Sequence, residues 1–243
     1  MKYSRIAVLT GAGISAESGI PVFRSEDGLW ENHRVEDVAT YEGFLRNKPL
    51  VHTFYNDRRR ACKTKVPNQG HLALTKLQQG IEAKGGKVTI ITQNIDDLHE
   101  KAKSHDIIHM HGELNKLWCE ACDTRFEYLE DSSTDLKCPH CGKAALRPDI
   151  VWFGEIPYRM DEIEACLTQC DLFLSIGTSG VVYPAAGFSR ICRYAGVPCI
   201  EFNLKPSEVR SSFTHAFYGK ASHTLDVFTD YLLAHDEIPD SID

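Results

Sequence analysis

Four of the nine cysteines have the spacing of a zinc site. Cys119 and Cys122 form one C-x2-C pair, and Cys138 and Cys141 form a second pair after fifteen intervening residues. Four thiolates favour a tetrahedral Zn²⁺ ion with every ligand position filled, so we expect one structural zinc and no activated water. Its role would be to fold a segment too small to hold itself together. A redox pair and a zinc ribbon for nucleic acid are the alternatives.

A glycine-rich stretch after the apolar run 5–9 fits the pattern G-x-G-x-x-A: Gly11-Ala12-Gly13-Ile14-Ser15-Ala16. This arrangement lets backbone N–H groups approach a pyrophosphate at a helix N-terminus. A glycine turn that serves packing alone is the alternative. Gly19-Ile20-Pro21 stops the expected helix after barely a turn, whereas a dehydrogenase continues with a long helix and a second strand. We therefore expect backbone N–H groups of this turn to hold the phosphates. The rest of the nucleotide must be bound differently from its binding in a dehydrogenase.

A polar loop, T-Q-N-I-D-D-L-H at 92–99, places amides and carboxylates directly after the apolar run 88–91. Such groups hydrogen-bond ribose hydroxyls and a carboxamide, because Asp accepts and Asn both accepts and donates. In the alternative interpretation, Asn94 or Asp96 only caps a helix that runs through His99.

Two histidines follow the short β-type run Ile107-Ile108. On a strand, alternation would point His109 and His111 to the same face, and Gly112 would free the backbone beyond them. The pKa of histidine makes it the best general base near neutral pH. A structural role for both is the alternative.

The elements that must position these groups begin with four apolar runs, each ending in a glycine or polar cluster: residues 5–9, 88–91, 172–176 and 197–202. Strands that are apolar on both faces and alternate with helices indicate an α/β fold, a parallel sheet covered by helices. Ligands bind outside the carboxyl ends of such strands. The helices are expected over residues 70–80, 161–169, 184–195 and 224–234, the third opening with Pro184.

Two stretches interrupt this alternation. Residues 20–69 are mixed and helical with no convincing second strand, and residues 113–147 hold the four cysteines among polar residues. We interpret both as insertions into one α/β core that jointly form a smaller domain.

Composition excludes several classes of protein. The 243 residues carry 34 acidic and 27 basic side chains with no basic stripe, which argues against a nucleic-acid partner. No apolar run approaches the roughly 18 residues of a membrane helix, and the N-terminus does not fit a signal peptide. We therefore expect a cytoplasmic protein without a membrane partner. The cysteines outside the quartet read as small buried apolar groups: Cys62, Cys166, Cys170, Cys192 and Cys199.

Taken together, these residues resemble the sirtuins, the NAD-dependent protein lysine deacylases. The matching segments occur in order along nearly the whole chain: G-A-G-I-S-A-E-S-G-I-P-x-F-R at 11–24, T-Q-N-I-D-D-L-H at 92–99, H-G at 111–112, the four cysteines, P-D-I-V-W-F-G-E at 148–155, G-T-S at 177–179 and E-F-N at 201–203.

The resemblance implies one catalytic domain over residues 1–243. A large Rossmann-like part, a parallel sheet with helices on both faces, would comprise residues 1–30, 70–112 and 148–243. A small domain would combine the helical insertion 31–69 with the zinc module 113–147. NAD would bind between the two as a consumed co-substrate, and one zinc ion would be structural.

The resemblance also assigns roles to single residues. The catalytic residues would be His111, as base, and Asn94. An acylated protein or peptide lysine would lose its acyl group to NAD, giving nicotinamide and 2′-O-acyl-ADP-ribose. The peptide would add an extended strand along Val151-Trp152-Phe153-Gly154-Glu155. The residues expected to bind NAD are Gly11, Ala12, Gly13, Ile14, Ser15, Ala16, Glu17, Phe23, Arg24, Trp30, Gln93, Asn94, Ile95, Asp96, Gly177, Thr178, Ser179, Asn203, Leu204, Lys205 and Ala221.

One pair of residues predicts the acyl group. Tyr55 and Arg58 stand at i and i+3 of a helical-looking stretch, and such positions share a helix face. A guanidinium beside a phenol suits a carboxylate. Sirtuins that remove succinyl and malonyl groups carry this Y-x-x-R pair, and Ala39 matches the small residue that widens their acyl pocket. The alternative is that Tyr55 packs in the core while Arg58 faces solvent.

We therefore expect a monomeric deacylase that prefers succinyl- or malonyl-lysine to acetyl-lysine. Three other functions stay open: an enzyme that is mainly a deacetylase, a protein ADP-ribosyltransferase, and a non-catalytic sensor of NAD or acyl-lysine. The ADP-ribosyltransferase would leave labelled adenylate on protein, and the sensor would release no nicotinamide.

Overall fold

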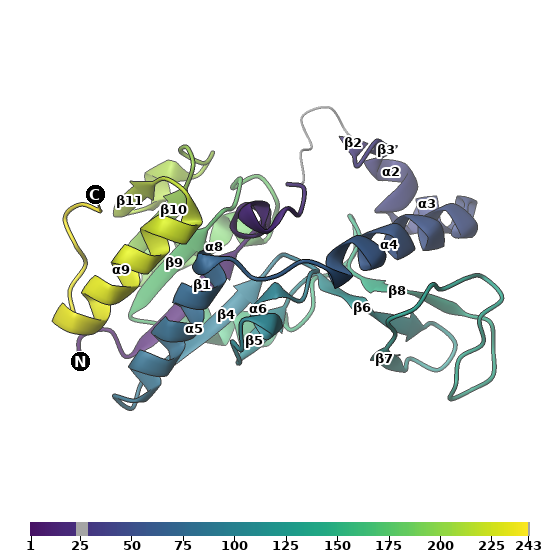
Figure 1. Cartoon of the computed structure of the whole chain (residues 1–243), viewed down its shortest axis with the longest axis horizontal. Helices are drawn as coiled ribbons and strands as arrows, with labels where there is room; N and C mark the ends of the chain where they lie inside the picture. The colour runs from purple at the N-terminus through teal and green to yellow at the C-terminus, as the bar shows by residue number, and fades with distance from the viewer. Residues whose placement is uncertain (23–28, 243) are drawn as a thin grey trace.

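The computed structural model describes residues 1–22 and 29–242 of the chain, which form a large lobe and a small lobe (Figure 1). The large lobe is built on a six-stranded sheet in the order β11-β10-β9-β1-β4-β5. Every neighbouring pair in it is parallel, so the predicted parallel α/β sheet is confirmed. Its strands are β1 (Arg5–Thr10), β4 (Lys87–Thr92), β5 (Ile107–His109), β9 (Leu172–Ile176), β10 (Cys199–Asn203) and β11 (His215–Tyr218).

Helices cover both faces of this sheet, which explains why its strands are apolar throughout. Along β1, Ile6 and Val8 pack on one face against α5 and α9. Ala7 and Leu9 pack on the other face against α7 and α8. The helical segments of this lobe are α1 (Ala12–Ser15), η1 (Ala16–Ser18), α5 (Gln69–Glu82), α6 (Leu98–Lys101), α7 (Met160–Gln169), η2 (Ala185–Gly187), α8 (Phe188–Tyr194), η3 (Arg210–Ser212) and α9 (Ala221–His235).

The small lobe combines a helical layer with a three-stranded antiparallel sheet in the order β7-β6-β8 (Figure 1). The two layers share one apolar core, in which Phe44 and Phe54 of the helices meet Ile150 and Trp152. The elements of this lobe are β2 (Leu29–Trp30), β3 (His33–Arg34), α2 (Val35–Val38), α3 (Tyr41–Arg46), α4 (Lys48–Lys63), β6 (Gly112–Cys119), β7 (Arg125–Glu127) and β8 (Leu146–Ile150).

Local signals explain where several helices begin and end. The helix after β1 ends at Gly19, whose φ of +76° continues no helix, as the G-I-P segment predicts. The side chain of Asn47 accepts a hydrogen bond from the Leu50 N–H and caps α4. Asn68 and His71 form a capping box that starts α5.

Three expectations about the elements need correction. The helix expected over 184–195 begins as the short turn η2, and α8 starts only at Phe188. The strand β11 was not expected, because only Phe217 of its four residues is buried and no apolar run marks it. The region 20–69 does contain a strand pair, the two-residue strands β2 and β3.

Candidate active site

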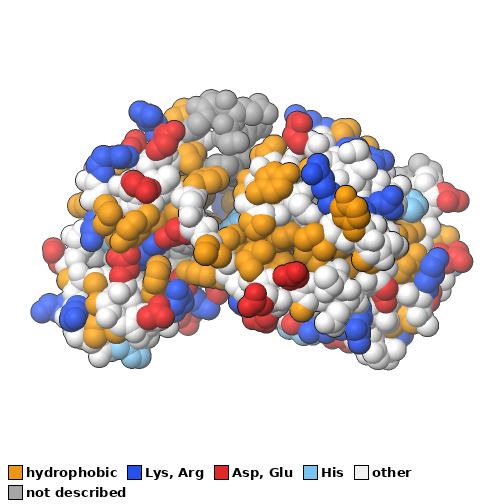
Figure 2. Space-filling model, turned by 180° about the vertical axis from the view of Figure 1, so that it is seen from behind, with side chains coloured by type: hydrophobic (Ala, Val, Ile, Leu, Met, Phe, Trp, Pro, Cys, Tyr) orange, Lys and Arg blue, Asp and Glu red, His pale blue; other side chains and the backbone are white. Residues whose placement is uncertain are grey.

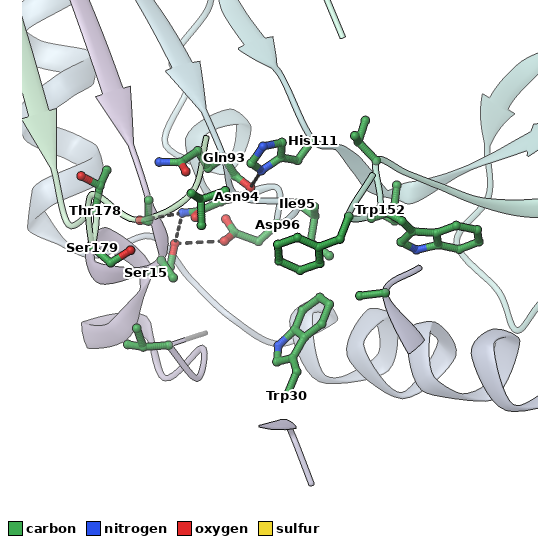
Figure 3. A pocket seen from close by; sticks show the side chains of 18 of the residues that line it. Ser15, Trp30, Gln93, Asn94, Ile95, Asp96, His111, Trp152, Thr178 and Ser179 are labelled. Carbon is green, nitrogen blue, oxygen red and sulfur yellow. Dashed lines mark hydrogen bonds between the residues drawn. The ribbon is translucent and has the colours of Figure 1, made fainter. Parts of the chain in front are cut away.

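A cavity lies between the lobes at the carboxyl ends of β1, β4 and β9 (Figures 2 and 3). Since β1 pairs with β4 on one side and β9 on the other, this is the switch point at which open α/β sheets bind ligands. The predicted residues that line it are Gly11, Ala12, Ser15, Trp30, Ala39, Tyr55, Gln93, Asn94, Ile95, Asp96, His111, Val151, Trp152, Phe153, Gly154, Gly177, Thr178 and Ser179.

His111 lines the cavity where the chain leaves β5. Its Nδ1–H donates to the carbonyl oxygen of Gln93 at 3.1 Å, which leaves Nε2 as the unprotonated nitrogen of a neutral ring. Burial lowers the pKa of His111 below its usual range, against the opposing effect of that hydrogen bond. A neutral imidazole with a free lone pair is the form that a general base needs at neutral pH.

The expectation that His109 and His111 share one strand face is wrong. The strand β5 ends at His109, so the alternation of a strand does not extend to His111. Gly112 then turns the chain with a φ of +83°. Nε2 of His109 lies 2.6 Å from a carboxylate oxygen of Glu100, and His109 is not among the residues that line the cavity.

A hydrogen-bonded group joins the loops after β1 and β4 (Figure 3). Asn94 Nδ2 donates to the carbonyl oxygen of Gly11 at 3.1 Å and to the Ser15 hydroxyl at 3.2 Å. Ser15 in turn donates to Asp96 at 3.0 Å. The other oxygen of Asp96 accepts from the N–H of Leu98, but the N-cap of α6 is Asp97, so neither Asn94 nor Asp96 is the cap of that helix. Burial raises the pKa of Asp96.

Two buried histidines behind this group were not singled out from the sequence. His71 Nε2 lies 3.5 Å from the Ser15 hydroxyl, and its ring packs edge-on against His99 at a centroid distance of 5.1 Å. His99 Nε2 lies 3.1 Å from the Thr10 hydroxyl. Burial lowers the pKa of His71 to about 4 and the pKa of His99 well below its usual range. Both rings are therefore neutral supports of the catalytic loops.

The glycines of the G-A-G turn pack against the loop after β9. The N–H groups of Gly11 and Gly13 donate to the carbonyl oxygens of Ile176 and Gly177, each at 2.9 Å. A Cβ atom added to Gly13 would lie 2.6 Å from the Cα of Gly177, so no side chain fits there. Close packing against the loop after β9 therefore explains why residue 13 is a glycine. The N–H groups of Gly11 and Gly13 are used in that packing, as the alternative interpretation of the glycine turn predicts.

The remaining residues expected around the adenosine end lie farther along the same sheet edge. Asn203 at the end of β10 donates from Nδ2 to the carbonyl oxygen of Thr178 at 2.8 Å, which ties two loops together. Glu17 accepts from the N–H and hydroxyl of Ser222 and so holds the start of α9, at Ala221. Leu204 and Lys205 are exposed, Ile14 is buried and Ala16 is half-buried. Phe23 and Arg24 lie outside the described residues.

At the opposite end of the cavity, Tyr55 and Trp152 form its buried floor. The indole N–H of Trp152 donates to the Tyr55 hydroxyl oxygen at 3.0 Å. The hydroxyl hydrogen of Tyr55 is therefore directed elsewhere and remains a donor. Burial raises the pKa of Tyr55, so the phenol keeps that hydrogen across the physiological range. Ala39 also lines the cavity and leaves room beside them.

Arg58 is half-buried and is not among the residues that line the cavity. Its guanidinium lies against Trp30, which does line the cavity, at 5.9 Å from the ring centroid. It also stacks on Phe54 at 3.5 Å and lies 3.6 Å from a carboxylate oxygen of Glu31. Arg58 therefore neither faces open solvent nor contacts the cavity directly.

The segment expected to pair with a peptide is already extended and held on one side. The N–H of Val151 donates to the carbonyl oxygen of His111, and that of Phe153 donates to Ala39. The fully buried Arg147 supports the segment from beneath, because it pairs bidentately with Glu155 and stacks on Trp152 at 3.5 Å. Six further residues that line the cavity were not assigned a place there from the sequence, and all of them except Tyr183 are apolar: Ile20, Pro21, Val22, Ile150, Val182 and Tyr183.

The four predicted zinc ligands meet in the small lobe. Their sulfur atoms all lie within 4.8 Å of one another, and Cys119–Cys141 and Cys122–Cys138 are 3.7 and 3.8 Å apart. A tetrahedral zinc with Zn–S bonds of about 2.3 Å places its sulfurs about 3.8 Å apart. The quartet therefore fits one structural zinc ion, and none of the four cysteines is among the residues that line the cavity.

Comparison with known proteins agrees with this architecture. A model described as the Sir2 family matches residues 11–184. The chain is 54% identical to an NAD-dependent protein deacylase of Vibrio parahaemolyticus, over 96% of this chain and 97% of that one. It is 52% identical to an NAD-dependent protein deacylase of Salmonella typhimurium, over 96% and 85% of the two chains.

Two solved structures extend the comparison. A mutant Sir2 homologue in complex with ADP-ribose matches with a TM-score of 0.86 at 35% identity, over 95% of this chain and 92% of that one. A Sir2 protein bound to an acetylated peptide matches with a TM-score of 0.78 at 28% identity, over 96% and 94%. The family match, the high identity over nearly the full length and the shared fold agree, and the chain belongs to the Sir2 family.

Proposed function

We propose that this Sir2-family protein is an NAD-dependent protein-lysine deacylase that removes succinyl and malonyl groups in preference to acetyl groups. The deacylase activity is that of the relatives named above. The acyl preference is supported by one observation: Tyr55, a buried hydrogen-bond donor, lines the cavity one helical turn from Arg58, whose guanidinium lies against Trp30 of the cavity lining. Two donors of this kind suit a carboxylate at the end of an acyl chain.

The residues around the cavity fit NAD. When bound there, NAD supplies a ribose carbon that releases nicotinamide and receives the acyl oxygen. Asn94, Ser15 and Asp96 offer the amide, hydroxyl and carboxylate groups that ribose hydroxyls and a carboxamide require. Nε2 of His111 accepts the proton of a ribose hydroxyl, since Nδ1 is occupied by Gln93. The acylated peptide would lie along the extended segment at Val151–Phe153, and to pair with Trp152 it would have to displace the carboxylate of Glu155, which accepts from the Trp152 N–H at 2.8 Å.

Replacement of Arg58 by Met tests the acyl preference. Loss of one charge-assisted hydrogen bond costs about 1.5–3 kcal/mol, so kcat/KM for a succinyl peptide should fall roughly ten- to a hundred-fold. Deacetylation should change little, because an acetyl group presents no carboxylate. Arg60→Met is the matched control: Arg60 lies on the same helix but is exposed and pairs with Asp57 and Asp131.

The assay is nicotinamide release with succinyl, malonyl, acetyl and unmodified versions of one peptide. Equal loss of desuccinylation and deacetylation in Arg58→Met would exclude the acyl assignment. Label from adenylate-labelled NAD that ends on protein instead of a small acyl ester would indicate an ADP-ribosyltransferase. We also propose that the protein acts in the cytoplasm and is a monomer. Cell fractionation would test the location, and light scattering would test the oligomeric state. Among the described residues, no helix is long and apolar enough to cross a membrane.

A further inference from the structure

The hairpin of β2 and β3 places a carboxylate of the protein on the guanidinium that is proposed to bind the acyl group. Glu31 Oε2 lies 3.6 Å from Arg58 Nη2. We propose that Glu31 is a specificity-determining residue: it occupies Arg58 before substrate binds, and a succinyl or malonyl carboxylate must displace it. This inference rests on the proposed acyl preference and extends it to a residue outside the Tyr55 and Arg58 pair.

The position of Glu31 is fixed by the hairpin. Glu31 and Asn32 have φ angles of +49° and +65°, as in a two-residue turn between paired strands. Trp30, next to the turn, packs edge-on against Phe54 at a centroid distance of 5.0 Å, and His33 packs on the same ring at 5.2 Å. Because Phe54 lies one helical turn before Arg58 on α4, this packing holds Glu31 over the guanidinium.

The hydrogen bonds of Arg58 leave one edge of its guanidinium incompletely used. Nη1 donates to the carbonyl oxygen of Phe54 at 2.7 Å. Nε is buried and has no hydrogen-bond partner among the described residues. Nη2 contacts Glu31 at a distance beyond a good hydrogen bond. The Nε and Nη2 edge is the one that binds a carboxylate through two parallel hydrogen bonds, so a better-placed carboxylate would gain both.

Glu31 and an acyl carboxylate compete for this edge. Burial alone lowers the pKa of Arg58 and the neighbouring Glu31 raises it, so the cation benefits from an anionic partner. Two carboxylates at the same edge repel each other. The side chain of Glu31 is 33% exposed, and an ion pair with such a partner is weak enough to be displaced. Glu31 therefore weakens binding of acidic acyl groups and has no effect on acetyl groups.

Replacement of Glu31 by Gln tests this inference. The change removes the charge but keeps the length of the side chain and the strain of the turn. The KM for succinyl and malonyl peptides should fall about two- to ten-fold, with kcat and the KM for the acetyl peptide unchanged. Glu36→Gln is the matched control, because Glu36 lies in the same lobe, is exposed and pairs with Arg34; it should leave all KM values unchanged.

A double-mutant cycle tests whether Glu31 changes the KM for the succinyl peptide through Arg58. In an Arg58→Met background, Glu31→Gln should no longer alter the KM for the succinyl peptide. An unchanged or higher KM in the single variant Glu31→Gln, while Arg58→Met still impairs desuccinylation selectively, would overturn only the role of Glu31. If Arg58→Met impairs both reactions equally, the acyl assignment fails and the role of Glu31 fails with it.

Discussion

Replacement of Tyr55 by Phe removes one oxygen atom from the buried floor of the cavity. That oxygen accepts a hydrogen bond from Trp152 Nε1 at 3.0 Å, and the exposed fractions of the two residues are 0% and 2%. A Phe ring keeps the edge-on contacts with Phe54 at 5.1 Å and Trp30 at 6.1 Å. The variant therefore tests the hydroxyl without opening a large cavity.

The loss of this oxygen leaves the Trp152 indole N–H buried without its acceptor, which costs about 1–3 kcal/mol. For a chain of this length, each kcal/mol lowers Tm by about 2–4 °C. The expected fall in Tm is therefore roughly 2–12 °C. The same variant loses the proposed hydrogen bond to the acyl carboxylate, so desuccinylation should fall further than deacetylation.

The assay combines thermal unfolding with nicotinamide release at a temperature at which the variant is folded. Tyr194→Phe is the control, because Tyr194 is 94% exposed. This substitution should change the free energy of unfolding by no more than about 0.5 kcal/mol. An unchanged Tm in Tyr55→Phe would refute the buried hydrogen bond. A lower Tm with equal loss of both activities would refute the role of the hydroxyl as a donor to the acyl group.

Three further predictions concern the base, the metal and pH. His111→Tyr should abolish the formation of deacylated peptide from every acyl peptide; retained deacylation would remove His111 from its role as base. Metal analysis should find one zinc per chain, and Cys138→Ala should lose the metal and lower Tm; full metal content in that variant would exclude the quartet as its site. In the unfolded chain His71 titrates near 6.5, but in the folded chain only near 4, so unfolding takes up a proton between these pH values. His71 alone should therefore lower the free energy of unfolding by about 1.6 kcal/mol from pH 6.5 to pH 5, and denaturant titration should show a pH slope that is smaller by about this amount in His71→Gln.

Residues with strong local signals were predictable from the sequence. The central strands follow from apolar runs buried on both faces, and the cysteine quartet follows from spacing alone. The loops after β1 and β4 were also expected at the carboxyl ends of their strands, and Asn94 and Asp96 lie there. In each case a short segment determines its own position.

Other features depend on partners that are distant in the sequence. Nothing in the G-A-G turn indicates that Gly13 meets Gly177 at a distance no side chain allows. His71 reads as an ordinary helix residue until Ser15 is found beside it. Glu31 likewise has no signal of its own, because its contact with Arg58 arises from the way the hairpin packs on Phe54.

The central position of β1 in the sheet has a consequence for synthesis on the ribosome. This strand is the first to emerge, yet it pairs with β4 at residues 87–92 and with β9 at residues 172–176. At about 5–20 residues per second, on the order of ten seconds pass before β9 follows β1 out of the ribosome. During that interval the edge of β1 that later pairs with β9 has no partner strand. The catalytic cavity, bounded by the loops after both strands, is among the last features to form.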